Sequence, residues 1–485
     1  MRDDTSSGDE PRANPAKRLV AAITSLDAEL FHDQAQRAFC ATPLDGARLI
    51  EAASFEQWAA GQYFRAYRSV IPQKALKDAL ATIAGMARFE AEQQPVYVRV
   101  ALHEGRHVID LGDAAQRCVL VDADGWRLAP HPVRFWRPDG QLPLPEPQAG
   151  GDVRNLLRFA HLAECDLPLL LAWVIEAWRC GTPKPLLELS GEHGASKSSA
   201  QRAVASLVDP HRIALQGAPR NARDLAAAAS GRWLLSFDNV SHLAPELQDQ
   251  LCVLATGGTF AERALYSNFG QANFDVLNPV ILNGIGGAVT RPDLLSRTLL
   301  LELVPISAAE RLTDGEFSQR FAAARPALFG ALLDLFVRAL ERLPDIHLPD
   351  KPRMADFALL GEAVTAALDW PVPFHELYAA NQREANVRVL EQYAVAQAVL
   401  QLLAQTKGQC GEGRFGELHR RLLKPDGADS RSWPSTPKGL SAVLARVTPA
   451  LRAVGVRVGH PPRTAAGRWI TFDGSAAADA LGDFT

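Results

Sequence analysis

The spacing of apolar residues changes several times along the chain, and each change predicts a different kind of structure. From residue 29 to residue 91 the apolar residues recur at helical spacing, which predicts mostly helices. Between residues 95 and 128 they fall into short runs separated by glycine-containing turns, which predicts a small β-meander. Residues 130–151 are dense in proline and predict a linker or a clamp. A helix pair is expected over residues 153–180. The core positions expected in the first helices are Trp58, Phe64, Tyr67, Leu76, Leu80 and Met86.

Three short, mainly apolar runs follow. They occupy residues 186–189, 232–237 and 279–282. The first leads into a glycine-bearing loop, the second ends at Asp238 and the third ends at Asn283. Unbroken apolar runs are typical of strands that are buried on both faces of a parallel sheet. Between the last two runs, two strand-like arms flank a turn near residues 268–270, which predicts a β-hairpin.

The last third of the chain is mostly helical in pattern and ends in a segment of different character. Residues 317–343 and 351–390 predict helices, and residues 390–472 predict three helices and a terminal β-hairpin, the order of a winged-helix domain. Residues 411–472 contain eleven Lys and Arg against four Asp and Glu, in a chain of net charge −4. This local positive charge indicates a DNA-binding surface, although winged helices also bind proteins. The cationic residues expected on the recognition helix and the wing are Lys438, Arg446, Arg452, Arg457 and Arg468.

Composition is typical of a soluble protein with several domains. The 485 residues are 47% hydrophobic and 22% charged, and no apolar run approaches the roughly 18–20 residues of a membrane helix. The polar N-terminus lacks a signal region and the six cysteines are scattered, which predicts a cytoplasmic protein. We predict a disordered segment, an α+β domain, an α/β core, a helical region and a winged-helix domain. Their expected bounds are 1–28, 29–150, 151–310, 311–389 and 390–485.

The candidate chemistry begins in the loop after the first buried run. It reads Ser-Gly-Glu-His-Gly-Ala-Ser-Lys-Ser-Ser over residues 190–199, and helical spacing follows. A buried strand, a glycine-bearing loop and a helix N-terminus form a phosphate cradle, because loop N–H groups and the helix dipole face the anion. Lys197 would neutralise the β- and γ-phosphates, and the Ser198 hydroxyl would bind Mg²⁺. The expected nucleotide contacts are Gly191, Glu192, His193, Gly194, Ala195, Ser196, Lys197, Ser198 and Ser199.

The loop departs from the usual G-x-x-x-x-G-K-[ST] pattern at one position. Ser196 stands where the second glycine is expected, and Gly194 lies two residues earlier. Glycine supplies backbone freedom at such positions, and Gly194 is expected to supply part of it. The alternative interpretation is an ordinary glycine- and serine-containing loop with a solvated lysine.

Two polar residues at strand ends complete the predicted site. Asp238 follows Lys197 by 41 residues and is expected to hold Mg²⁺ through water, although an aspartate there is also a common turn or cap residue. Asn283 follows Asp238 by 45 residues. We expect it beside Asp238 across the sheet, where its amide would orient water toward the γ-phosphate. These residues together predict a site for ATP and Mg²⁺.

The order of these motifs resembles that of AAA+ ATPases over residues 186–306. In those proteins a short helix with the pattern Asp-Leu-Leu-x-Arg, here residues 293–297, follows the sensor strand. Its arginine reaches the nucleotide of the neighbouring subunit. The resemblance implies this role for Arg297, with Arg291 as the second candidate. The alternative is that Arg297 is a surface arginine that pairs with Asp293.

The same resemblance implies further roles. The helices after the core would form a lid, in which Arg353 senses the nucleotide unless it pairs with Asp356. Asn239 stands where many ring ATPases carry a glutamate that activates water, so it bears on the rate of hydrolysis. The predicted hairpin resembles the one that superfamily 3 helicases project into their central pore to hold single-stranded DNA, unless its aromatic residues pack on their own domain. The hairpin residues implied in this contact are Arg263, Tyr266 and Phe269.

Four further motifs resemble ATP-binding proteins encoded by prophages and integrated mobile elements, often alongside primase-like modules. They lie at residues 219–225, 254–258, 281–285 and 352–357. This resemblance implies an α/β protein with an AAA+-like core and helical lid, between an α+β N-terminal domain and a winged helix. It implies a hexameric ATPase that translocates on single- or double-stranded DNA, with primase or other replication proteins as partners. The alternative is a nucleotide-gated DNA-binding initiator or regulator with slow or no hydrolysis.

Overall fold

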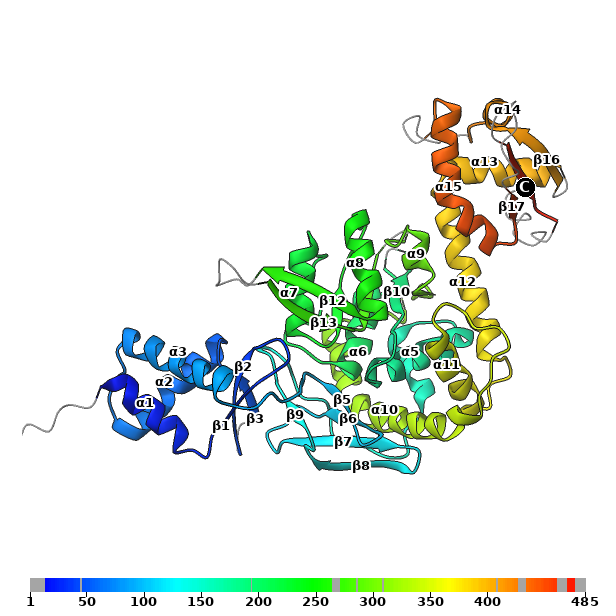
Figure 1. The fold of residues 1–485 in the computed structure, drawn as a ribbon. Helices are drawn as coiled ribbons and strands as arrows, with labels where there is room; N and C mark the ends of the chain where they lie inside the picture. The colour runs from blue at the N-terminus through cyan, green and yellow to red at the C-terminus, as the bar shows by residue number, and fades with distance from the viewer. Residues whose placement is uncertain are drawn as a thin grey trace, which may run out of the picture.

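The chain folds into an N-terminal part, a central α/β body and a C-terminal domain (Figure 1). The structure is a computed structural model that describes residues 14–43, 46–192, 194–263, 271–284, 287–307, 309–406, 409–425, 433–459 and 469–475. Of residues 261–263, 271–275 and 409–413 it describes the backbone alone. The long helix α12 (Phe374–Glu391) leads from the central body to the C-terminal domain.

A four-stranded parallel sheet organises the central body. Its strands, in spatial order, are β11 (Leu235–Phe237), β14 (Val280–Asn283), β10 (Leu186–Ser190) and β15 (Thr298–Glu302). The three mainly apolar runs form β10, β11 and β14, as predicted, and every residue of these three strands is buried. The parallel sheet predicted from those runs is therefore confirmed, with β15 as its fourth strand.

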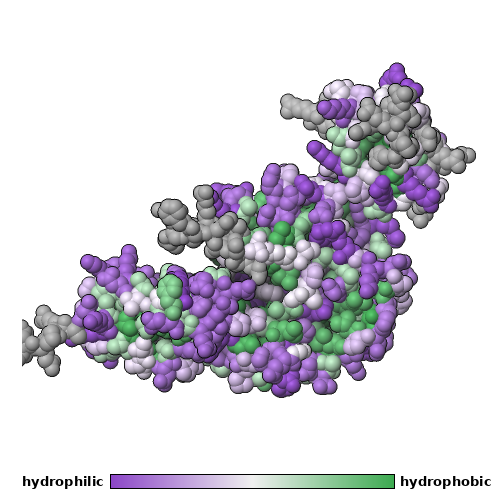
Figure 2. Space-filling model, viewed as in Figure 1, coloured by the Kyte–Doolittle hydropathy of each residue, from purple (hydrophilic) through white to green (hydrophobic). Residues whose placement is uncertain are grey.

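Helices cover both faces of this sheet. Successive side chains of a strand point to opposite faces, so Leu187 and Leu189 of β10 join one core while Leu186 joins the other. The helices of the first core are α5 (Leu167–Trp178), α6 (Lys197–Val208), α10 (Asp314–Arg342) and α11 (Ala355–Ala367). Those of the second core are α7 (Ala222–Gly231), α8 (Pro245–Thr256), α9 (Pro292–Leu295) and part of α12. On the visible face, hydrophobic residues show mainly on this central body (Figure 2).

Short elements connect the main ones. The predicted hairpin is present as β12 (Gly258–Arg263) paired antiparallel with β13 (Gln271–Val276), and its turn lies outside the described residues. Instead of a simple helix pair, residues 153–178 form α5 preceded by three single-turn helices. These are η1 (Val153–Leu156), α4 (Leu157–Ala160) and η2 (Glu164–Asp166), and a further turn, η3 (Leu343–Asp345), follows α10.

The N-terminal part corrects two expectations. Residues 15–24, predicted to be disordered, form helix α1 (Pro15–Thr24), because the Asn14 side chain caps the Ala16 N–H and Leu19 is fully buried. Residues 29–49, predicted to be helical, form a three-stranded antiparallel sheet. Its strands are β1 (Glu29–His32), β2 (Ala38–Thr42) and β3 (Gly46–Leu49).

Two helices complete this N-terminal part, as predicted. They are α2 (Ala53–Tyr67) and α3 (Gln73–Phe89). Of the expected core positions, Leu76 is buried and Trp58 and Leu80 are half-buried against the same core. Phe64 and Tyr67, expected in the core, remain 48% and 37% exposed on the last turn of α2.

The predicted β-meander is confirmed and packs on the central body. Its antiparallel strands are β5 (Val100–His103), β6 (Arg106–Asp110), β7 (Arg117–Asp122) and β8 (Gly125–Pro130). A short parallel pair, β4 (Val96–Tyr97) and β9 (Arg134–Phe135), flanks it. The Trp126 indole donates to the Asp334 carboxylate of α10 at 2.7 Å, and the meander shares the first helical core. The composition of the chain changes near residue 150, but the segments before and after it share one hydrophobic core.

The proline-rich segment forms a clamp between parts of the chain. Its backbone N–H groups at Leu142, Leu144 and Gln148 donate to carbonyls of three other segments, at 2.8, 2.8 and 3.0 Å. Those carbonyls belong to Pro210 after α6, Leu111 after β6 and Pro326 within α10. Of the two possibilities left open by the sequence, the clamp is the one observed.

A buried arginine fixes this clamp to the sheet core. The Arg99 side chain is fully buried, and its Nε donates to the Asp209 carboxylate at 2.8 Å. Its two terminal nitrogens donate to the carbonyls of Asp110 and Leu142. The meander, the clamp and the end of α6 therefore meet on one guanidinium.

The C-terminal domain has its own core and its own sheet. Its helices are α13 (Ala394–Gln405), α14 (Phe415–Arg421) and α15 (Pro437–Ala453). Its antiparallel strands, in spatial order, are β16 (Gln409–Arg414), β18 (Trp469–Asp473) and β17 (Arg457–Gly459). Three helices and a terminal hairpin were predicted, and β16 is the additional strand. In the described parts of the chain, no helix has the length and apolar character needed to cross a membrane.

Replacing Arg99 with alanine is predicted to destabilise the central body by about 3–5 kcal/mol, because the Asp209 carboxylate would stay buried without its partner. The matched control is Arg106→Ala, whose ion pair with Asp122 on the meander surface is partly exposed and contributes about 0–1 kcal/mol. Urea unfolding of both variants measures the difference. Equal free energies of unfolding for the two variants would contradict this account of the clamp.

Candidate functional site

The loop between β10 and α6 has the backbone shape of a phosphate cradle. Gly194 has a φ of +84°, and Ser196, immediately before α6, has a φ of +55° in the left-handed region. A side chain at such a φ costs about 1–2 kcal/mol, which glycine avoids. Ser196 replaces the second glycine of the usual motif at a position where the loop requires a left-handed backbone. The serine adopts that conformation.

The cationic residue of the loop lies against its first carbonyls. The Lys197 ammonium donates to the carbonyls of Gly191 and Glu192 at 2.7 and 2.8 Å. Lys197 is also the first residue of α6, so its charge and the positive end of the helix dipole lie together. Ala195 is buried beneath the loop. His193, predicted as a nucleotide contact, lies outside the described residues.

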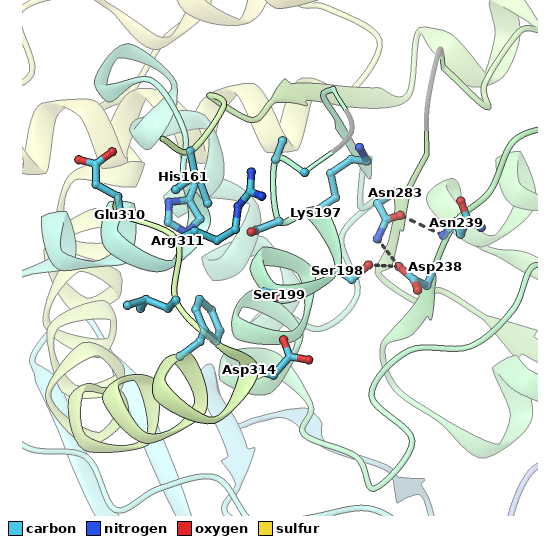
Figure 3. A pocket seen from close by; sticks show the side chains of 16 residues that line it. His161, Lys197, Ser198, Ser199, Asp238, Asn239, Asn283, Glu310, Arg311 and Asp314 are labelled. Atoms are coloured by element: carbon cyan, nitrogen blue, oxygen red, sulfur yellow. Dashed lines mark hydrogen bonds between the residues drawn. The ribbon is translucent and has the colours of Figure 1, made fainter. Parts of the chain in front are cut away.

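One carboxylate oxygen joins the loop to the strand ends (Figure 3). Asp238 Oδ1 accepts a hydrogen bond from the Ser198 hydroxyl at 2.7 Å and another from the Asn283 amide at 2.6 Å. The Asn239 backbone N–H donates to Asn283 Oδ1 at 2.9 Å. The structure therefore brings together the loop serine, the strand-end aspartate and the third-strand asparagine, at the positions expected for them.

A buried glutamine that the sequence analysis missed supports this arrangement. Gln201 of α6 is fully buried, and its amide nitrogen donates to Ser236 Oγ at 2.8 Å and to the Phe237 carbonyl at 3.1 Å. Its amide oxygen accepts from Asn283 Nδ2. Gln201 therefore fixes the orientation of the Asn283 amide. The sequence feature that could have pointed to Gln201 is its position as a polar residue among the small apolar positions of α6.

A cavity of about 520 Å³ opens beside these residues. Besides the loop residues Gly194 to Ser199 and the strand-end residues, it is lined by His161, Ile306, Glu310, Arg311, Leu312, Asp314 and Phe317. A second cavity of about 1010 Å³ adjoins it and shares His161, Ile306, Glu310 and Leu312. Sequence analysis predicted none of these additional residues, because they come from segments with no motif spacing.

His161 stands where the two cavities meet. It has a φ of +50°, an uncommon conformation for a residue other than glycine and one that clusters at functional sites. Burial lowers the pKa of its imidazole, which favours the neutral ring near neutral pH. A neutral imidazole supplies one donor and one acceptor.

The donor set at Asp238 suits a magnesium ion. The Ser198 hydroxyl and the Asp238 carboxylate are hard oxygen ligands, and Mg²⁺ is usually bound by one or two protein oxygens together with water and substrate phosphates. The described residues contain no group of three or more His, Cys, Asp or Glu that would form a cage for a metal ion. A metal at this position would share its coordination with a phosphate ligand.

The three predicted arginines are engaged by carboxylates outside the cavity. Arg297 is only 8% exposed, and its guanidinium pairs with the Asp293 carboxylate at 2.8 Å. Arg353 pairs with the same Asp293 at 3.2 Å rather than with Asp356, and Arg291 pairs with Asp249 at 3.0 Å. The pairing of Arg297 with Asp293 is thus as in the alternative, but the arginine is buried and not on the surface. Arg353 does not line the cavity.

The structure describes the side chains of only some of the predicted DNA-contacting residues. Lys438 and Arg446 of α15 are exposed. Arg452 donates to the Val458 carbonyl, and Arg457 lies 3.6 Å from the Asp473 carboxylate. Arg263 lies in β12, where the structure describes only the backbone. Tyr266, Phe269 and Arg468 lie outside the described residues.

Comparison with known families identifies the chain. Residues 153–380 match the family described as "Actinomycete integrative conjugative element replication protein", and residues 395–479 match the RepA C-terminal domain of the same elements. Together the two matches span well over half of the chain. The chain belongs to this family. It is a replication protein of an integrative conjugative element, which confirms the mobile-element origin expected from its motifs.

Similar solved structures include two helicases and the C-terminal region of another protein. "SCCmec type IV Cch - active helicase" has 10% identity and a TM-score of 0.45, with 94% of each chain covered. The NrS-1 C-terminal region has 11% identity and a TM-score of 0.41, covering 95% of this chain and 100% of that one. JCV helicase has 13% identity and a TM-score of 0.25, covering 48% and 66%. Superpositions this loose support no inference about activity. No curated protein matches the chain.

A buried glutamate lies in β10, the strand that leads into the phosphate loop. Glu188, in the middle of β10, is fully buried, and its carboxylate accepts the backbone N–H of Ala288. Burial raises the pKa of Glu188 to about 7. The residue thus holds the segment that connects Asn283 to α9.

The raised pKa predicts a specific dependence of stability on pH. The unfolded carboxyl titrates near 4.5 and the folded one near 7. Its contribution to stability is therefore fully present below pH 4.5 and is lost as the pH rises through 7. Relative to Glu188→Gln, the wild-type free energy of unfolding should fall by up to ~3 kcal/mol between about pH 5 and about pH 8.

Urea unfolding at both pH values measures this change, with Glu246→Gln on the exposed face of α8 as the control. A difference between wild type and Glu188→Gln that stays constant with pH would contradict the assignment.

Proposed function

We propose that this replication protein binds and hydrolyses ATP in the cavity beside Asp238 and uses the nucleotide to act on DNA. The observation that carries the proposal is the shared hydrogen bonding of Ser198 and Asn283 on Asp238 Oδ1. It unites a phosphate cradle, a metal-binding carboxylate and a water-orienting amide at one edge of a parallel sheet. Ligands bind at this edge of open α/β sheets, outside the carboxyl ends of the strands.

Each residue has a role in this proposal. The loop N–H groups and Lys197 bind the phosphates. Ser198 and Asp238 hold Mg²⁺, which neutralises phosphate charge. Asn283, oriented by Gln201, positions the attacking water. The larger adjoining cavity takes the nucleoside, with His161 at the junction between base and phosphates.

The proposal includes an oligomer, with a hexameric ring as the expected form. An arginine that completes the site of a neighbouring subunit must reach outside its own subunit. Arg297 is buried on Asp293, whereas the Arg291 side chain is 44% exposed. Arg291 is therefore the better placed of the two for a role in trans, which is worth orders of magnitude in rate.

DNA binding is assigned to the C-terminal domain. A helix, a strand, two helices and two strands follow one another in this domain, which is the order of a winged helix. The exposed Lys438 and Arg446 lie on α15, which would act as the recognition helix. The hairpin β12–β13 is assigned to single-stranded DNA within the ring.

A second candidate function is favoured by Asn239. Its side chain lines the cavity, but an amide cannot act as a general base. A protein with slow or no hydrolysis would be a nucleotide-gated DNA-binding switch, such as an initiator. Unwinding of a forked duplex separates the two, because a helicase displaces the strand and a switch changes only its DNA affinity.

Replacing Lys197 with alanine is predicted to weaken ATP binding about 10- to 100-fold, the loss expected for one or two charge-assisted hydrogen bonds. DNA-stimulated hydrolysis should be abolished. Titration calorimetry and phosphate release measure the two effects. The control is Arg202→Ala, an exposed cation of the same helix α6 that does not line the cavity. Full hydrolysis by Lys197→Ala would refute the site.

Replacing both Lys438 and Arg446 with alanine is predicted to weaken DNA binding by the whole protein. The slope of log affinity against log salt should fall by about 2, because two phosphate contacts are lost. Lys74→Ala with Lys77→Ala, on the exposed face of α3, removes the same charge elsewhere and serves as the control. Fluorescence anisotropy over a salt series is the measurement, and an identical slope in both double variants would count against the assignment.

A further inference from the structure

Arg311 differs from the arginines that the sequence predicted. Its side chain lines the cavity beside the phosphate loop, whereas Arg291, Arg297 and Arg353 are paired with carboxylates outside it. No hydrogen bond or ion pair within the described part of the chain engages the Arg311 guanidinium. Figure 3 shows the side chain reaching from the segment before α10 toward the loop that carries Lys197.

The guanidinium lies directly against the backbone of the phosphate loop. A Cβ atom built on Gly194 would stand 3.2 Å from a terminal nitrogen of Arg311. The φ of +84° at residue 194 favours glycine, and a Cβ there would also crowd this side chain. A cation whose donors have no partner among the described residues is thus held beside the N–H groups that would receive the phosphates.

The side chains around the cavity carry more negative than positive charge when Arg311 is left out of the count. Lys197 supplies one positive charge, while Asp238, Glu310 and Asp314 supply negative charge. A nucleoside triphosphate brings several more negative charges, of which one Mg²⁺ neutralises two. Arginine binds phosphate oxygens through two parallel N–H donors, so Arg311 has both the position and the geometry for this contact.

We propose that Arg311 binds a phosphate group of the nucleotide from within the same subunit. This inference rests on the proposed ATP site. Arg311 lies three residues before α10. The β-meander contacts α10 through the hydrogen bond between Trp126 and Asp334. α10 also contacts the end of α6, where Arg325 donates to the Ser206 carbonyl at 2.7 Å. The phosphate contact therefore links the nucleotide to the helix on which the meander packs.

The test compares Arg311→Gln with Arg383→Gln. Arg383 is an exposed arginine of α12 that lines neither cavity, so the two variants make the same chemical change in different places. Titration calorimetry of the full chain with adenosine, ADP and ATP gives the dissociation constants. Arg311→Gln is expected to weaken ATP binding about 10- to 100-fold and to leave adenosine binding unchanged. Arg383→Gln should match wild type for all three ligands, and Arg311→Lys should recover part of the ATP affinity.

The outcomes separate this inference from the function on which it rests. If Lys197→Ala loses ATP binding while Arg311→Gln behaves like Arg383→Gln, the role of Arg311 is refuted and the ATP site stands. An equal loss of adenosine and ATP affinity in Arg311→Gln would also refute it, because a phosphate contact cannot act on adenosine. If the wild-type chain binds no ATP, both proposals fail.

Discussion

The site depends on a single oxygen atom, Asp238 Oδ1, which accepts hydrogen bonds from Ser198 and Asn283. These residues come from three places in the chain, the start of α6 and the ends of β11 and β14. They meet because the three strands are parallel and share one edge of the sheet. Burial of Gln201 beneath them fixes the asparagine amide. A change in the register of any one strand would separate the group.

The positive charges of the central body are divided between two places. Asp293, at the start of α9, holds Arg297 and Arg353, so the segment after Asn283 is tied to the chain just before α11. Lys197 and Arg311 face the cavity instead. Pairing with a carboxylate offsets the cost of burying a guanidinium, whereas no carboxylate of the described residues pairs with Lys197, which donates to two loop carbonyls, or with Arg311. On this ground phosphate binding is proposed for Lys197 and Arg311, and Arg297 is given a structural role within its own subunit.

Much of the core was predictable because local pattern and global fold agree there. The mainly apolar runs before Gly191, Asp238 and Asn283 predicted the strands, and their parallel order predicted that Asp238 and Asn283 would be neighbours. The left-handed backbone at Ser196 falls where the motif differs from its usual form. The meander was predictable from its turns.

Other features had no signal of comparable strength. The strands over residues 29–49 are short, and their burial does not alternate strictly, so their pattern resembles that of a helix. Helix α1 depends on the packing of Leu19 and Ile23 against distant residues. His161 precedes the first strand of the parallel sheet along the chain, and Arg311 follows the last one. Only folding brings the two residues to the same cavity. The burial of Arg297 likewise depends on tertiary packing that its motif does not encode.

The central claim is that the Asp238 carboxylate binds a metal ion that is shared with the phosphates of ATP. It is tested most directly by measuring ATP affinity by calorimetry, in Mg²⁺ and in EDTA, for the wild-type chain and for Asp238→Asn. The account predicts that Mg²⁺ tightens ATP binding by the wild type and has no such effect on Asp238→Asn. An equal effect of Mg²⁺ on both proteins would contradict it.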